Sequence, residues 1–181
     1  MENAPLSPQK DTQNGLAHFQ AGDFATAKED FLRAVEGYNA MGDKLAVAEI
    51  NNNLSTVYLK LGDAASAWKV VTGTDAIFES AGDTRRQALA LGNQAAVLEA
   101  LGKLDQAVEK YETCADLLKT VNDHENRAIV LQALSQLQLR MGRQLEAITS
   151  MQIALGNKPK LSLRERVLNK LLGITSRIFP H

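Results

Sequence analysis

The stretch Gly62-Asp63-Ala64-Ala65-Ser66-Ala67 decides the fold, because the same phrase returns at a fixed spacing along the chain. A glycine stands every forty residues, and an alanine follows each of these glycines five positions later: Gly22, Gly62, Gly102 and Gly142, then Ala27, Ala67, Ala107 and Ala147. A second phrase runs half a period out of step, as Gly42-Asp43, Gly82-Asp83 and Asn122-Asp123. A period of this length is typical of stacked-repeat proteins.

Two turn signals in every forty residues, with no proline between Pro8 and Pro159, predict pairs of helices. Glycine tolerates a positive φ at the end of one helix, and aspartate caps the start of the next. Apolar residues recur at helical spacing between the turns, most clearly at Val47, Ile50, Leu54, Val57, Tyr58 and Leu61. The pattern predicts an all-α solenoid of four units, at about 9–41, 44–81, 84–121 and 124–155. Each small alanine lets the two helices of its unit approach closely.

The predicted units are flanked by two other segments. Residues 1–8 contain two prolines and no helical period, which predicts a flexible leader. After Leu155 the period stops, and Ser162-Leu163-Arg164-Glu165 has the spacing of a capping box. Residues 156–181 are therefore predicted to form a capping helix that covers the last apolar face. Gly73 falls inside a predicted helix, where it costs about 1 kcal/mol relative to alanine and marks either a close helix crossing or a weak point.

Charge is unevenly distributed along the 181 residues, although the net charge is only −1. Residues 1–155 hold 14 Lys and Arg against 20 Asp and Glu, whereas residues 156–181 hold six against one. The net charge of the whole chain gives no argument for a nucleic-acid or membrane partner. The basic surplus of the tail is either a solvated helix face or an interaction surface, made of Lys158, Lys160, Arg164, Arg166, Lys170 and Arg177.

These features resemble those of the tetratricopeptide repeat family. The resemblance covers about Gln9 to Leu155 and rests on the turn glycine, the alanine five residues later and an aromatic residue beyond it, kept as Phe31 and Tyr111. The unit length and Leu91-Gly92-Asn93-Gln94-Ala95 resemble the forty-residue variant found in scaffold and regulator proteins. The resemblance implies a right-handed superhelix whose first helices line a concave groove that binds a peptide or helix of a partner.

When the groove-lining positions of the family are carried over to this sequence, the residues expected to line the groove are Gln13, Asn52, Asn53, Thr56, Lys60, Asn93, Gln132, Gln136 and Arg140. Carboxamides both donate to and accept from a peptide backbone, which suits such a surface, although the same residues could simply form the wet side of a helix layer. Some family members hold a chaperone's C-terminal carboxylate with a clamp of Lys, Asn, Asn, Lys and Arg. The matching positions here are Thr12, Leu16, Asn53, Leu89 and Asn93, so only Asn53 fits that clamp.

Signatures of catalysis and metal binding are missing from the sequence. One cysteine, Cys114, and three scattered histidines give neither an intrachain disulfide nor a metal-ligand pattern. His124-Glu125 begins like a zinc-protease helix but has no second histidine at the required spacing. We therefore expect a non-enzymatic protein without cofactor or metal. The lone cysteine, the lack of an apolar signal segment and the lack of a spanning segment favour a cytoplasmic location.

Three functional hypotheses remain open. The first is a non-catalytic scaffold or adaptor that binds a protein or peptide partner in the groove. The second places function in the basic tail, docking on an acidic surface such as anionic lipid, RNA or an acidic protein. The third is weak self-assembly through the apolar side of the final helix, with Phe179 exposed.

Overall fold

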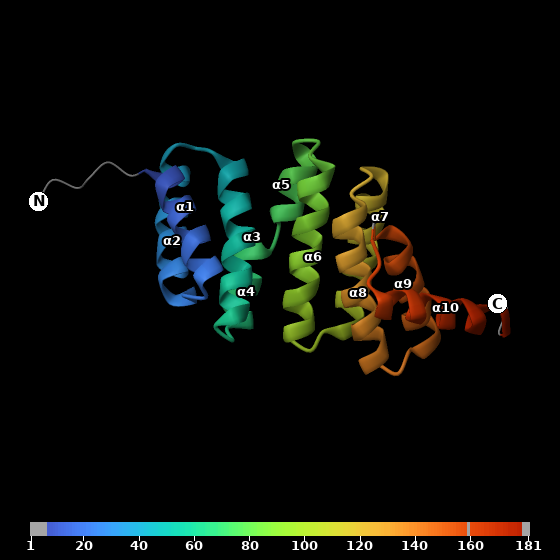
Figure 1. Ribbon diagram of the computed structural model, residues 1–181. Helices are drawn as coiled ribbons and strands as arrows, with labels where there is room; N and C mark the ends of the chain where they lie inside the picture. Colours follow the sequence, from blue (N-terminus) through green and yellow to red (C-terminus); the bar gives the residue numbers. More distant parts are fainter. Residues whose placement is uncertain (1–6, 159, 179–181) are drawn as a thin grey trace, which may run out of the picture.

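Figure 1 shows the computed structural model, which describes residues 7–158 and 160–178, apart from the side chains of residues 171 and 173–178. Every regular element in this part of the chain is an α-helix. In order they are α1 (Pro8–Ala21), α2 (Phe24–Ala40), α3 (Lys44–Lys60), α4 (Ala64–Val71), α5 (Thr74–Ser80), α6 (Thr84–Ala100), α7 (Leu104–Thr120), α8 (His124–Arg140), α9 (Gln144–Asn157) and α10 (Leu163–Ile178).

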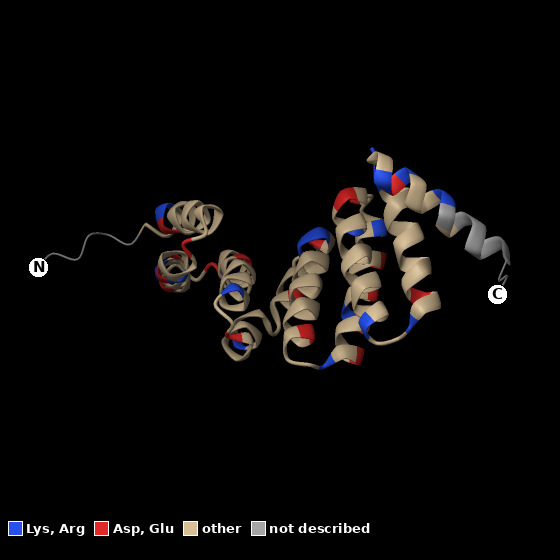
Figure 2. Ribbon diagram, turned by 60° about the horizontal axis from the view of Figure 1, so that its bottom comes forward, with Lys and Arg blue, Asp and Glu red and all other residues tan. Residues whose placement is uncertain are grey.

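The helices stand side by side in sequence order, so the predicted all-α solenoid is confirmed (Figure 1). The first helices of the four units are α1, α3, α6 and α8, and each packs against the second helix of its own unit. The helix axes rotate along the row: in Figure 2, α1–α4 are seen nearly end-on, whereas α6–α9 are seen from the side. This rotation gives the array its superhelical twist.

The turns form as the sequence predicts. Gly62 adopts a φ of 79°, which a residue with a Cβ rarely adopts, and so ends α3 at no steric cost. Asp63 then caps α4 by accepting a hydrogen bond from the Ser66 backbone N–H at 2.9 Å. Asn122 takes the place of the glycine before α8, with a φ of 56°. Asparagine is the residue that best replaces glycine in this conformation.

The core runs between the helix layers as a series of clusters. The four repeated alanines are buried in it, with 0 or 1% of their surface exposed, as their predicted role at close helix crossings requires. Phe31 of α2 fills the first unit and packs with Ile50, Leu54 and Val57 of α3. Pro8, which the predicted leader included, instead begins α1 and is buried against Gly37. Residues 1–6 of that leader lie outside the described residues.

The second helix of the second unit is broken, which corrects the sequence prediction. Gly73 does not lie inside a helix but between α4 and α5, with a φ of 81° that ends the first segment. The break frees the Val71 carbonyl, which then accepts hydrogen bonds from the Thr74 hydroxyl at 2.9 Å and the Gln94 carboxamide at 3.1 Å. Gly73 thus marks a break between two helices. The carbonyl that the break leaves without a helical partner is hydrogen-bonded by the side chains of Thr74 and Gln94.

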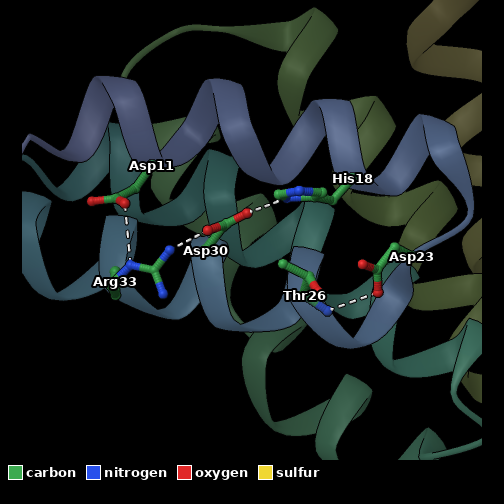
Figure 3. Close-up of polar contacts among 6 residues, drawn as sticks. All are labelled: Asp11, His18, Asp23, Thr26, Asp30 and Arg33. Carbon is green, nitrogen blue, oxygen red and sulfur yellow. Dashed lines mark hydrogen bonds and ion pairs between the residues drawn. The ribbon is translucent and has the colours of Figure 1, made fainter.

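A buried carboxylate joins the two helices of the first unit (Figure 3). Asp30 of α2 is 3% exposed, and its Oδ2 lies 2.6 Å from Nδ1 of His18 on α1. Its other oxygen accepts from Arg33, whose Nε donates to Asp11 of α1 at 3.2 Å. His18 is therefore a structural partner of this carboxylate.

Replacing Asp30 with alanine should destabilise the first unit by about 1–2 kcal/mol, because His18 and Arg33 lose their shared acceptor. The cost stays moderate because the side chains of both partners are nearly half exposed, 41% for His18 and 48% for Arg33, so water can replace the acceptor. Urea denaturation would measure the change, with exposed Glu29 replaced by alanine as the control. Equal losses in the two variants would contradict a role for the Asp30 contacts.

The capping box before α10 forms as predicted. The Ser162 backbone N–H donates to Glu165 at 2.8 Å, and the Glu165 N–H donates to the Ser162 hydroxyl at 3.3 Å. A hydrogen bond from Lys158 at 2.5 Å and those from Ser162 lower the pKa of Glu165 to about 2. Helix α10 lies against α9 and continues past the end of the row in Figure 1.

Candidate functional site

The residues predicted to line a groove all lie on first helices and repeat at the forty-residue period. Four registers hold the nine of them: Gln13, Asn53 and Asn93; Thr56 and Gln136; Lys60 and Arg140; Asn52 and Gln132. Residues of one register occupy equivalent places on successive units.

Three of the registers lie on one accessible surface of α1, α3, α6 and α8, which we call the first-helix face. Its members are Gln13, Lys60, Gln136 and Arg140, which are exposed, and Asn53, Thr56 and Asn93, which are half-buried. Asn53, Thr56 and Lys60 follow each other at three and four residues along α3, so their side chains form one stripe. Seven of the nine residues are thus accessible on the first helices, and their role in binding stays a prediction.

In the fourth register Asn52 turns toward its own second helix, so the prediction was wrong for this residue. Its side chain is 8% exposed, and its Oδ1 accepts a hydrogen bond from the Thr74 hydroxyl of α5 at 3.2 Å. The equivalent Gly92 points at its own second helix too, since a Cβ there would lie 3.3 Å from Sγ of Cys114. Gln132 shares this register and is half-buried. The physical reason is that neighbouring residues point about 100° apart around a helix.

A small hollow opens in the first-helix face between α1 and α3. It has a volume of about 100 Å³ and is lined by Leu16, Phe19, Phe31, Asn53 and Thr56. Leu16 is 40% exposed here. The hollow therefore combines an apolar wall with a carboxamide and a hydroxyl at its rim.

Ion pairs tie consecutive first helices together beside this surface. Arg86 of α6 contacts Glu49 of α3 at 3.1 Å, and Arg140 of α8 pairs with Glu99 of α6. Arg140 is consequently engaged within the array. Glu99 was not among the predicted residues, although its separation from Arg140 by about one period was a signal that these opposite charges would meet.

Comparison with known proteins identifies the architecture. Residues 86–159 match a family model described as "Tetratricopeptide repeat". This segment of the chain contains tetratricopeptide repeats. The matched segment begins in α6 and includes all of α7, α8 and α9. The resemblance to the forty-residue variant of the family stays a prediction.

A curated relative matches most of the chain. "Protein unc-45 homolog B" of Danio rerio is 27% identical over 168 residues, which cover 88% of this chain. The same alignment covers 17% of that relative, so the chain spans only a small part of its length.

The carboxamides of the helical array fall into two groups. Those that hold the repeats together are hydrogen-bonded: Gln94 donates to Asp75 at 2.7 Å, and Gln138 accepts from Ser150 at 2.8 Å. By contrast, the side chains of Asn53 and Asn93 form no hydrogen bond to any residue that the structure describes. Half-buried polar groups of this kind gain from an external partner.

The basic residues predicted in the tail also fall into two groups, those that form an ion pair and those that do not. Lys158 is not free, because its Nζ lies 2.5 Å from Glu165, and this corrects its place in the predicted patch. Lys160, Arg164, Arg166 and Lys170 are exposed and form no ion pair within the described residues. The side chain of Arg177, and all of Phe179, lie outside the described residues.

Two features of the described residues bear on possible chemistry, their metal-ligating groups and the thiol of Cys114. Within residues 7–158 and 160–178, no group of three His, Cys, Asp or Glu is placed to hold a metal ion. Cys114 of α7 is fully buried in the third unit, and burial raises the pKa of its thiol to about 12. Its thiolate is therefore scarce at neutral pH, which argues against a reactive cysteine. None of the described helices is long and apolar enough to cross a bilayer.

Proposed function

We propose that this chain is a non-catalytic protein-interaction module that binds an extended segment of a partner protein along the first-helix face. The observation that carries the proposal is the row of carboxamides at one register of successive repeats, Gln13, Asn53 and Asn93. Equivalent groups one repeat apart can bond to successive stretches of one extended backbone. Because they have no hydrogen-bond partner among the described residues, binding does not break an existing contact.

The hollow beside Asn53 adds a place for a side chain of the partner. Its lining by Leu16, Phe19 and Phe31 favours an apolar group of modest size. A rigid stack of helices presents this surface ready-made, so little conformational entropy is lost on binding. The proposed mode is backbone recognition by carboxamides with one apolar anchor.

Replacing Asn53 and Asn93 together with alanine should weaken partner binding about ten- to thirtyfold, the equivalent of two lost hydrogen bonds. The partner would first be captured from native lysate on the immobilised chain and identified by mass spectrometry. Peptides tiling its sequence would then be titrated by fluorescence anisotropy against the wild-type chain and the double variant.

The matched control replaces two exposed carboxamides on second helices, Asn39 of α2 and Gln106 of α7, with alanine. These changes should leave the affinity unchanged. If the Asn53/Asn93 variant binds as tightly as the wild type, the first-helix face is not the binding surface.

A further inference from the structure

The described part of α10 presents an apolar strip that no element of the array covers. Leu163 is 79% exposed and Val167 is 54% exposed, and the two lie one turn apart on the same side of the helix. The contact with α9 lies elsewhere on α10, where Gln152 donates to the Leu172 carbonyl at 2.7 Å. The helix therefore packs on one side and leaves a second, apolar side open.

Positive charges border this strip along both edges. At about 100° per residue, Arg166 and Lys170 fall on one side of Leu163, and Arg164 falls beyond Val167 on the other. All three cations are exposed and form no ion pair among the residues that the structure describes. Figure 2 shows the blue Lys and Arg positions gathered on the start of α10, at the far end of the array. An apolar strip between cationic edges is typical of helices that lie in a membrane interface.

We propose that α10 docks the protein on an anionic phospholipid surface, with Leu163 and Val167 inserted shallowly and Arg164, Arg166 and Lys170 at the headgroups. Charge complementarity favours this occupant, because the tail is basic while residues 1–155 are acidic overall. A negative surface attracts the tail and repels the rest of the chain, so the chain would bind through α10 with residues 1–155 directed away from the lipid.

The small apolar area that the described side chains of α10 offer argues against a second copy of the chain as the occupant of the strip. A stable protein interface buries about 1,600 Å² in total. The described side chains of α10 offer few exposed apolar groups: Leu163, Val167 and, at 39%, Leu168. A lipid surface requires less apolar area, because each nearby Lys or Arg adds its own attraction to anionic headgroups.

The test is co-sedimentation of the full chain with vesicles of phosphatidylcholine alone or mixed with phosphatidylserine. Binding to the mixed vesicles only, weakening as salt is raised, is the expected result. Replacing both Arg166 and Lys170 with glutamate should lower the affinity by at least about thirtyfold, because two attractions of about 1 kcal/mol each are lost and two repulsions are added. Replacing Leu163 and Val167 with serine should lower it without altering the charge, which separates insertion from simple electrostatic attraction.

The matched control replaces Lys69 of α4 and Lys119 of α7, both exposed, with glutamate. It carries the same charge change and should bind almost as well as the wild type, while circular dichroism checks that all variants are folded. The proposal is overturned if the wild-type chain ignores anionic vesicles. It is equally overturned if the Arg166/Lys170 and control variants bind alike, or if light scattering shows a dimer that the Leu163/Val167 variant loses.

Discussion

Replacing Phe31 with alanine is expected to destabilise the chain by about 3–5 kcal/mol. The ring is 1% exposed and fills the space between α1, α2 and α3. It also packs directly against Gly15, where an added Cβ would lie 2.7 Å from ring carbons. Its loss would leave a cavity that the surrounding backbone cannot close, because Gly15 contributes no side chain to fill it.

The loss should be local, because each repeat contacts only its neighbours. Hydrogen exchange should become faster at amides of α1, α2 and α3 and stay unchanged in α7 and α8. Urea denaturation would measure the change in the free energy of unfolding. The control is Leu32→Ala, one residue along α2 and 43% exposed, which should cost less than about 1 kcal/mol. Similar losses in the two variants would show that Phe31 is not the centre of this core.

Replacing Gln94 with methionine is the second large effect, with an expected loss of about 2–3 kcal/mol. The shapes are similar, but the variant loses two hydrogen bonds, to the Val71 carbonyl at 3.1 Å and to the Asp75 carboxylate at 2.7 Å. Gln94 is 2% exposed, so water cannot readily replace its donor. A hydrogen bond to a charged group contributes about 1.5–3 kcal/mol, and a neutral one about 1 kcal/mol.

Hydrogen exchange distinguishes this prediction from a general loss of packing. Amides of α4 and α5 on either side of Gly73 should lose protection first, because Gln94 satisfies the backbone at that break. Gln106→Met, at an exposed position of α7, provides the control and should leave the unfolding midpoint unchanged. If α4 and α5 keep their protection in the Gln94 variant, the break is stabilised by other contacts.

Part of the first-helix face could be predicted from the sequence, because Asn53, Thr56 and Lys60 fall at helical spacing on one side of α3. The same reasoning included Asn52, because neither residue type nor spacing shows which edge of a polar stripe turns inward. The direction of Asn52 depends on Thr74, 22 positions away along the chain. That contact exists because the helix after Asp63 breaks at Gly73, a position that the sequence marked only as either a close helix crossing or a weak point.

The sequence by itself determined the helical units, the turns between them and the stacking order, because these depend on local propensities repeated every forty residues. It also determined the capping box before α10, whose two residues lie three positions apart. Only the tertiary structure decided which polar groups are used inside the array and which remain available to a partner. Lys158, Arg140 and Asn52 are engaged, whereas Asn53, Asn93 and Arg166 are not, because side-chain pairing depends on the packing of residues distant in sequence.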